Sequence, residues 1–386
     1  MKKNILFLFL LFSIDIYSSF VKIGAEMVSL GLVKTKLKKL LCSYDNIMAT
    51  AIPDAKKGDL MTTVDIHSHL LNSEVKFDRF YDKLAIKFFG KKFGLVAEDL
   101  IQNPYKEYVR TISSNTKESK YIAKIVLFGV DARVNDKGET IHKDITVCAS
   151  NEDLLEVYKE HPSVIIPFFS INPMRPDAIK SIEKYHALGF KGAKFLQNYW
   201  GVDTREERYK PYFEKLAELK IPLIVHIGSE SSVHSFKSCE GINMLDAPLA
   251  AGVTVIAAHM ALSYAPLGIF KALSKKPKNF NDDYFTLLKM LETHENLYAD
   301  ISAILTPVRA KVLPHLSKQT QVHHKLLFGT DFPVPFFDIL NTHDLPFKKR
   351  REISKIKNPG DRYIATLLEY FKDSHPIWTN YRKVLL

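Results

Sequence analysis

Six side chains of metal-binding type are spread along the chain, each at or just after a short apolar run. They are His67, His69, Lys194, His226, His259 and Asp331. The first two are two residues apart, so on an extended backbone both imidazoles point to the same side, about 7 Å apart along the chain. Such a pair can bind one metal ion. A His-x-His pair alone is weak evidence because histidine serves many roles, so the prediction of a metal site depends on the other four residues.

Eight short β-branched or aromatic runs supply strands that would carry these side chains. The runs cover 63–67, 123–128, 163–170, 190–195, 222–226, 253–257, 296–300 and 325–329. Amphipathic segments lie between them at 152–160, 176–185 and 212–219, and Gly189 stands where the second would end. This alternation predicts an α/β fold, the (β/α)8 TIM barrel. An open doubly wound sheet is the competing fold, disfavoured because no Gly-rich phosphate loop follows the first run.

The spacing of the candidate ligands matches the repeat of such a barrel. Lys194 precedes His226 by 32 residues, and 33 and 72 residues separate the next two ligand pairs. One βα unit takes about 31 residues, so the ligands fall at the ends of strands one, four, five, six and eight. His67 lies 127 residues before Lys194, which requires an insertion after the first strand. The aromatic and basic stretch 77–107 fits that insertion, either as a lid over the barrel mouth or as a helical pair at the barrel edge.

Six short motifs contain or flank these residues. They are Asp65-Ile-His-Ser-His69, Gly189-Phe-Lys-Gly-Ala-Lys-Phe195, Pro222-Leu-Ile-Val-His-Ile-Gly228, Ala257-Ala-His259, Tyr298-Ala-Asp-Ile-Ser302 and Leu327-Phe-Gly-Thr-Asp-Phe-Pro333. In this order and spacing they resemble the amidohydrolase superfamily, in particular its amidohydrolase-2 branch of metal-dependent TIM-barrel hydrolases. The resemblance runs from about residue 61 to residue 335. It implies that His67, His69 and Asp331 bind a buried divalent metal, for which zinc is expected, and that His226 is a further ligand.

The resemblance gives Lys194 and His259 alternative roles. In dinuclear members of the superfamily the lysine is carboxylated and bridges two metals, and the sixth-strand histidine binds the second metal. In mononuclear members, which include decarboxylases, that histidine is catalytic and the lysine is not a ligand. An inward lysine beside three histidines is costly unless it is neutralised or bonded, so a carboxylated Lys194 and a plain amine both remain open. We expect Asp65 and Asp300 to orient ligand imidazoles.

The leading functional hypothesis is hydrolysis of an amide, ester or lactone-like bond of a small molecule by a metal-activated water. Asp331 would serve as general base, and His259, where it is not a ligand, would stabilise the oxyanion. Loop residues after strands three to five are expected to bind the substrate. These are Arg175, Gln197, Asn198, Tyr199, Trp200, Ser229 and Glu230.

Two other functions compete with hydrolysis. A mononuclear metal-dependent decarboxylase acting on an aromatic or enoic carboxylic acid is the first. A barrel that binds a ligand without turning it over is the second, and the full set of candidate ligands argues against it.

The first forty residues differ from the rest of the chain. The net charge is +11, but residues 1–41 hold seven lysines against two acidic residues, and no nucleic-acid-binding motif occurs, so nucleic acid is not an expected partner. The basic start and the apolar run 5–12 are typical of a secretory signal, and the lysines between 34 and 39 could contact an anionic membrane surface. A segment docked on the domain is the alternative.

These features set the expected organisation. We expect an N-terminal extension over 1–60 and a barrel with C-terminal helices over 61–386. The location is cytoplasmic if the extension docks on the domain, and exported or membrane-associated if it is a signal or a membrane contact. Three cysteines without a CxxC pair predict reduced thiols.

Overall fold

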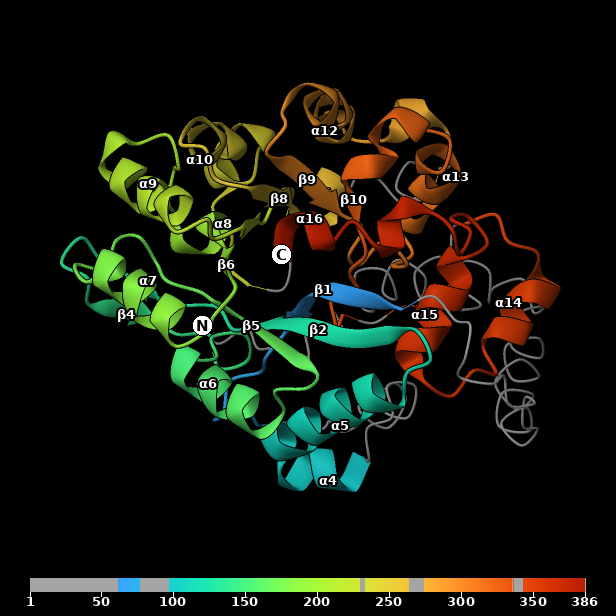
Figure 1. Cartoon of the computed structure of the whole chain (residues 1–386), viewed down its shortest axis with the longest axis horizontal. Helices are drawn as coiled ribbons and strands as arrows, with labels where there is room; N and C mark the ends of the chain where they lie inside the picture. The colour runs from blue at the N-terminus through green and yellow to red at the C-terminus, as the bar shows by residue number, and fades with distance from the viewer. Residues whose placement is uncertain are drawn as a thin grey trace, which may run out of the picture.

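The computed structural model describes residues 62–76, 97–229, 233–263, 274–334, 336 and 343–385. Eight parallel strands form one sheet in the order β1-β2-β5-β6-β7-β8-β9-β10. Their bounds are β1 Thr63–His69, β2 Ile122–Phe128, β5 Ile165–Phe169, β6 Gly192–Phe195, β7 Leu223–Val225, β8 Val255–Ala257, β9 Leu297–Asp300 and β10 Leu326–Leu327. Each lies within or overlaps one of the eight predicted runs, and helices surround them (Figure 1). The TIM barrel predicted from the sequence is therefore confirmed.

Helices follow the strands and pack on their outer side. The longer ones are α5 Pro104–Glu118, α6 Asn151–Glu160, α7 Ala178–Ala187, α9 Lys210–Glu218, α12 Asp282–Thr293 and α15 Pro359–Leu367. The shorter ones are α4 Ala97–Gln102, α8 Gln197–Trp200, α10 Asp246–Ala250, α13 Leu313–Leu316, α14 Phe347–Ile353 and α16 Arg382–Leu385. No helix in the described ranges is long and apolar enough to cross a membrane. The expected extension over residues 1–60 lies outside these ranges.

Two of the three predicted helices have a cap that their sequences provide, α6 at its start and α7 at its end. Ser150 and Asp153 form a reciprocal capping box at the start of α6. Gly189 follows α7 in the left-handed conformation, with φ of +94°. Its N–H donates to the carbonyl of His186, and the next N–H, from Phe190, donates to Tyr185. This Schellman arrangement needs a positive φ at Gly189, which glycine adopts without strain.

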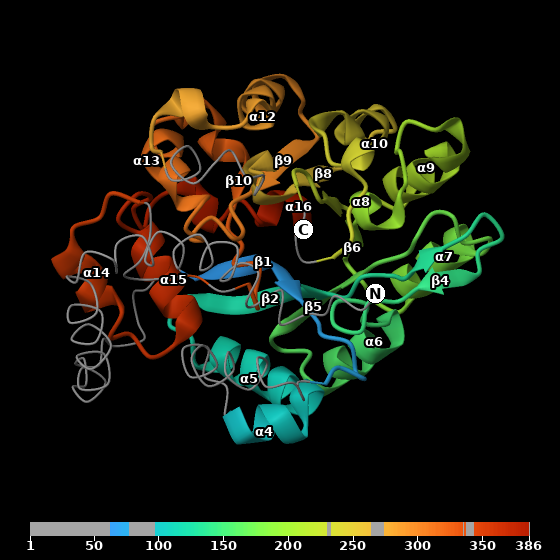
Figure 2. The same cartoon turned by 180° about the vertical axis from the view of Figure 1, so that it is seen from behind.

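The insertion after the first strand is partly visible. Helices α4 and α5 occupy residues 97–118 between β1 and β2, and both views show them outside the barrel beside β2 (Figures 1 and 2). The described end of the predicted 77–107 stretch is therefore helical and covers the barrel edge. Residues 77–96, where the alternative of a lid would also fall, lie outside the described ranges.

Hydrogen bonds between β1 and the segment after β10 close the barrel. The N–H of Ile66 donates to Phe328 O at 3.1 Å, and the N–H of Asp331 donates to His67 O at 2.8 Å. A parallel bridge joins Ser68 to Phe332. This seam joins residues about 265 positions apart in the sequence and brings the eighth-strand aspartate beside the first-strand histidines.

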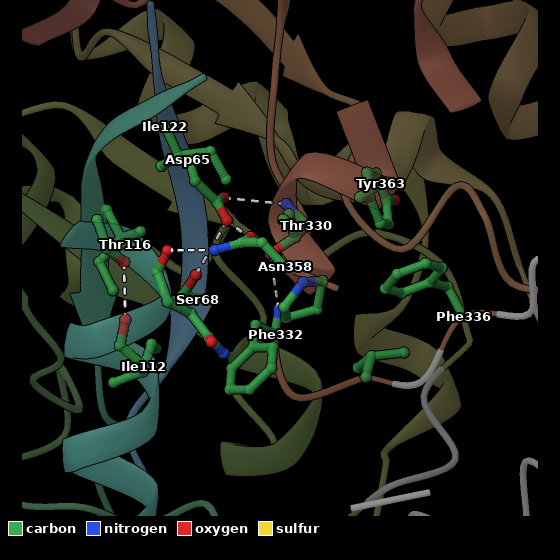
Figure 3. Close-up of a pocket in the computed structure, with 15 residues that line it drawn as sticks. Asp65, Ser68, Ile112, Thr116, Ile122, Thr330, Phe332, Phe336, Asn358 and Tyr363 are labelled. Atoms are coloured by element: carbon green, nitrogen blue, oxygen red, sulfur yellow. Dashed lines mark hydrogen bonds between the residues drawn. The ribbon is translucent and has the colours of Figure 1, made fainter. Parts of the chain in front are cut away.

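The buried Asp65 carboxylate reinforces the seam. It accepts hydrogen bonds from the N–H and hydroxyl of Thr330 at 3.0 and 2.6 Å, from the N–H of His67 at 3.1 Å and from the Ser68 hydroxyl at 3.3 Å. Figure 3 shows Asp65, Ser68 and Thr330 at the edge of a pocket between the seam and helices α5 and α15, and Asn358 also lines this pocket. We expected Asp65 to orient an imidazole, and that prediction is wrong: its oxygens are taken by the backbone and hydroxyls of the seam.

One extra residue in β1 sets the direction of the histidines. Asp65 pairs with Ile125 and Ser68 with Leu127, so three steps on β1 oppose two on β2. Such a bulge changes which face the following side chains occupy. Ile66 belongs to a buried cluster made mainly of strand side chains. This cluster fills the barrel interior, so Ile66 faces inward. After the bulge His67 also faces inward, where its ring meets the Phe128 ring at 5.0 Å.

The C-terminal segment covers the end of the barrel opposite the strand ends that carry the histidines. Val384 of α16 packs with the interior strand cluster, and α16 lies near the centre of the helical ring (Figure 1). Trp378 O accepts the Thr63 hydroxyl at 2.7 Å, and the Asn380 amide donates to His323 O and Leu326 O at 2.9 and 2.8 Å. We call this C-terminal cover, residues 375–385 with the His323 that it contacts, the floor of the barrel. The floor is held by hydrogen bonds as well as by apolar packing.

Hydrogen bonds define which ring nitrogens donate and which accept in His323 and His375 of the floor. Nε2 of His323 donates to Leu316 O at 3.0 Å, so its Nδ1 accepts from Nε2 of His375 at 2.8 Å. Nδ1 of His375 in turn accepts from the N–H of Ile377 at 3.2 Å. Burial, together with the neighbouring His323, lowers the pKa of His375 to about 4. A proton added to His375 has no acceptor in this arrangement.

The floor is therefore expected to weaken in acid. Since the pKa of His375 is about 4 in the folded chain and about 6.5 in the unfolded chain, its contribution is complete above pH 6.5 and is lost as pH falls towards 4. Urea unfolding at pH 7 and pH 4.5 should show a smaller loss of unfolding free energy in His375→Gln than in the wild type. His186→Gln, at an exposed position, is the control. An equal loss in wild type and His375→Gln would contradict this assignment.

Candidate metal centre

The predicted ligands meet at the carboxyl ends of the strands. They come from β1 and β6 and from the segments that follow β7, β8 and β10, and their set is His67, His69, Lys194, His226, His259 and Asp331. All are buried except His69, whose side chain is 18% exposed. The ring centroid of His67 lies 5.5 Å from that of His69 and 4.9 Å from that of His259. His226 lies 5.2 Å from His259. The barrel thus brings together all six residues selected from the sequence.

Asp331 faces the histidines from the closing side of the barrel. Its Oδ1 lies 3.4 Å from Nε2 of His67 and 3.2 Å from Nε2 of His69, and its Oδ2 lies 3.8 Å from Nδ1 of His259. The residue has φ of +65°, a conformation that costs free energy outside glycine. The seam holds it there through the Asp331 N–H to His67 O bond.

The hydrogen-bond partners of His67 show which of its two ring nitrogens carries the proton. Nδ1 lies 2.8 Å from Oδ2 of Asp300, and an ionised carboxylate can only accept, so Nδ1 carries the proton. Nε2 then presents a lone pair, which faces Oδ1 of Asp331 and accepts from the Lys194 amine at 3.2 Å. Within the described ranges Oδ1 of Asp331 has no hydrogen-bond partner.

Two lone pairs that face each other in a buried site suit a cation. One donor atom each from His67, His259 and Asp331 lies within 4.8 Å of the others. Neutral imidazole and carboxylate are the ligands that zinc and similar divalent ions take in proteins. The residues present therefore fit a divalent metal.

The charges around the site keep these ligands in the form that binds metal. Burial raises the pKa of Asp331, but the neighbouring His67, His69 and Lys194 outweigh it and hold the pKa at about 2. Burial and the Lys194 charge lower the pKa of His67. Burial and Arg309 lower the pKa of His259 well below its ordinary value. Metal binding requires deprotonated ligands, and this arrangement supplies them at neutral pH.

Asp300 connects the two sides of the site. Its Oδ2 accepts from His67, and its Oδ1 accepts from the N–H of His259 at 2.8 Å, from the N–H of Ser302 at 3.0 Å and from the Ser302 hydroxyl. The prediction that Asp300 orients a ligand imidazole agrees with its contact to His67. The same carboxylate also holds the backbone of His259, which the sequence did not indicate.

The family follows from the sequence as a whole. A family model described as "Amidohydrolase" matches residues 64–347, which include every residue of this site. The chain belongs to the amidohydrolase family. It is accordingly an enzyme, built on the TIM barrel that the sequence predicted. No curated protein matches it significantly.

Three solved structures are among those similar to this amidohydrolase. A probable 2-pyrone-4,6-dicarboxylic acid hydrolase from Acinetobacter baumannii, with citric acid bound, is 13% identical, covers 84% of this chain and 99% of its own, and has a TM-score of 0.50. An amidohydrolase from Burkholderia multivorans with bound zinc is 12% identical, with coverages of 84% and 99% and a TM-score of 0.46. A manganese-bound 5-carboxyvanillate decarboxylase from Novosphingobium aromaticivorans is 13% identical, with coverages of 81% and 97% and a TM-score of 0.41. At this identity the similarity concerns the fold.

Four of the residues expected to bind substrate have their polar ends engaged within the amidohydrolase itself. Arg175 makes two bonds to Asp131, at 2.6 and 2.7 Å, and the Trp200 indole donates to Asp131 O at 2.8 Å. The Gln197 amide donates to His226 O and to Cys239 O. The Tyr199 hydroxyl bonds His142 and the N–H of Asp144. Their contact with substrate stays a prediction.

The other three residues expected to bind substrate are Asn198, Ser229 and Glu230. The Asn198 amide donates to the Ser235 hydroxyl at 3.0 Å. The Ser229 hydroxyl contacts the Ser263 hydroxyl at 2.5 Å. Glu230 lies outside the described residues. These three roles also stay predictions.

Two residues near the site were not selected from the sequence. Ser302, which contacts His259, lies two positions after Asp300, the same alternation that relates His67 to His69, and this spacing could have indicated it. Arg309 lies in the segment after β9 with 2% exposure, and its Nε donates to Leu262 O at 3.0 Å. No sequence pattern marks Arg309, because its proximity to His259 results from the path of that loop.

Replacing the connecting carboxylate should weaken metal binding. In Asp300→Asn, the amide N–H₂ would replace one of the two oxygens that accept hydrogen bonds from the His67 ring and the His259 N–H. One of these two donors would then lose its acceptor. We expect metal affinity to fall about 10- to 100-fold, measured by competition with a chromogenic chelator. Asp203→Asn, a carboxylate paired with Arg205 near the surface, should bind metal as the wild type does. Wild-type affinity in Asp300→Asn would show that the His67 orientation does not depend on Asp300.

Proposed function

We propose that this amidohydrolase is a metal-dependent hydrolase that cleaves an amide, ester or lactone-like bond of a small molecule, with water as nucleophile. The observation that carries the proposal is a pair of buried acceptor atoms, Nε2 of His67 and Oδ1 of Asp331, that lie 3.4 Å apart beside the Lys194 amine. The family supports hydrolysis as the reaction class. The Acinetobacter protein of similar fold is a probable hydrolase, which is consistent with this proposal.

The chain supplies the ligands from rigid strand ends. His67, His69 and Asp331 would hold the metal, and His226 and His259 border the same space. A bound divalent ion such as Zn²⁺ polarises a carbonyl and lowers the pKa of water from about 15.7 to near 7. Asp300 holds the His67 ring so that its lone pair stays directed into the site.

Asp331 is the proton acceptor in this proposal. Its carboxylate is ionised at neutral pH because its pKa is about 2, and in the proposed reaction it takes a proton of the attacking water and passes it to the leaving group. A positioned general base contributes roughly 10²- to 10⁴-fold. Replacing it should therefore affect turnover more than a change of charge elsewhere on the barrel.

The number of metal ions in this proposal depends on whether Lys194 is carboxylated. Its amine donates to Nε2 of His67 in a fully buried position. Carboxylation would turn this donor into a bridging ligand for a second ion, and the plain amine would leave a mononuclear site. A mononuclear site also suits the decarboxylase alternative, which is the reaction named for the Novosphingobium protein.

Metal content tests the number of ions. Protein produced with added zinc and manganese should contain two equivalents per chain that fall to one in Lys194→Ala, as measured by plasma mass spectrometry. One equivalent in the wild type would contradict the dinuclear arrangement. No bound metal in the wild type would overturn the proposed function.

Product analysis tests the reaction. We expect the metal-loaded enzyme to hydrolyse a member of a panel of lactones, acyl amides and esters, and kcat to fall about 10²- to 10⁴-fold in Asp331→Asn. Asp203→Asn is the matched carboxylate control. Aromatic and enoic carboxylic acids belong in the same panel, and release of CO₂ from them without hydrolysis of the others would favour the decarboxylase.

A further inference from the structure

The proton of the His259 ring can be assigned from what surrounds its Nδ1. The carbonyl oxygen of Ser302 lies 3.3 Å from this nitrogen and the Ser302 hydroxyl oxygen lies 2.7 Å from it. A carbonyl oxygen has no proton and can only accept. The hydroxyl could in principle donate or accept, so its own proton must be located.

The single proton of the Ser302 hydroxyl is already used. It donates to Oδ1 of Asp300, an acceptor that also receives the N–H of Ser302 and the N–H of His259. The other oxygen of Asp300 receives Nδ1–H of His67 at 2.8 Å. The hydroxyl oxygen of Ser302 therefore meets Nδ1 of His259 with a lone pair, and both neighbours of that nitrogen are acceptors.

The backbone fixes the same ring independently. His259, Met260 and Ala261 have φ of +59°, +54° and +53°, three consecutive left-handed residues without glycine, each of which costs free energy. The His259 N–H to Asp300 bond at 2.8 Å and the Leu262 N–H to His259 O bond at 2.9 Å hold this turn. The ring thus has little freedom to turn Nδ1 away from Ser302.

We propose that Ser302 is a positioning residue that holds His259 in the Nδ1–H tautomer, so that the lone pair of the ring lies on Nε2. The inference rests on the proposed function for its catalytic consequence. In this tautomer His259 binds a cation or accepts a proton. It does not donate a hydrogen bond to an oxyanion through Nε2, which is the role that the sequence had left open for it.

Nitrogen NMR of histidine reads the tautomer directly. Long-range ¹H–¹⁵N spectra of ¹⁵N-histidine-labelled protein, metal-free and zinc-loaded, should show Nδ1 of His259 protonated, with the signals identified by their loss in His259→Gln. Ser302→Ala should give a mixture of tautomers, and Ser302→Thr, which keeps the hydroxyl, should restore the wild-type pattern. Ser170→Ala is the matched control, because this buried hydroxyl accepts the Asp131 N–H at 3.2 Å and no contact joins it to an imidazole among the described residues.

Kinetics provide a second readout on the metal-loaded enzyme. We expect Ser302→Ala to lower kcat about 10- to 100-fold with KM within about twofold, because the hydroxyl acts on the histidine and not on the substrate. Ser302→Thr should recover most of kcat.

The outcomes separate the two proposals. A wild-type His259 protonated at Nε2 overturns the role of Ser302 without any variant, as does a Ser302→Ala protein with unchanged tautomer and kcat. A Ser302-dependent Nδ1–H signal in a protein that hydrolyses nothing in the panel supports the positioning role and overturns the hydrolase.

Discussion

One buried carboxylate, that of Asp300, holds the two halves of the metal centre together. It accepts four hydrogen bonds, from the ring of His67, the backbone of His259 and two donors of Ser302. A buried charge is costly unless its lone pairs are used, and four donors match the capacity of a carboxylate. The consequence is that the first, sixth and seventh strands are coupled at the site through one side chain, and that both imidazoles have defined donor and acceptor nitrogens.

Strain and stability occupy opposite ends of this barrel. His259, Asp331 and Ala303 all have positive φ, and they lie at or after the strand ends where the ligands meet. The opposite end is closed by α16, by Asn380 and by the His323–His375 contact. This division is typical of TIM-barrel enzymes, in which one face carries chemistry and the other carries stability. A well-packed floor allows the costly backbone conformations at the mouth to persist.

The sequence determined the strands and singled out the candidate ligands. Apolar runs at a repeat of about 31 residues require parallel strands with a common edge, so Lys194, His226 and His259 had to converge wherever the barrel closed. The same argument gave the insertion after the first strand. These features depend on local periodicity and on the direction of the strands, which are written in short stretches of sequence.

Only the tertiary structure decided which hydrogen-bond partner each buried polar side chain has. Asp65 and Asp300 are both buried acidic residues of parallel strands, yet Asp65 holds the seam and Asp300 holds the histidines. Likewise Arg175 and Tyr199 follow strands on the catalytic side but bond to Asp131 and His142. The reason is physical: each of these partnerships joins segments that are 41 or more residues apart in the chain, so its geometry exists only after those segments have been brought together by the fold.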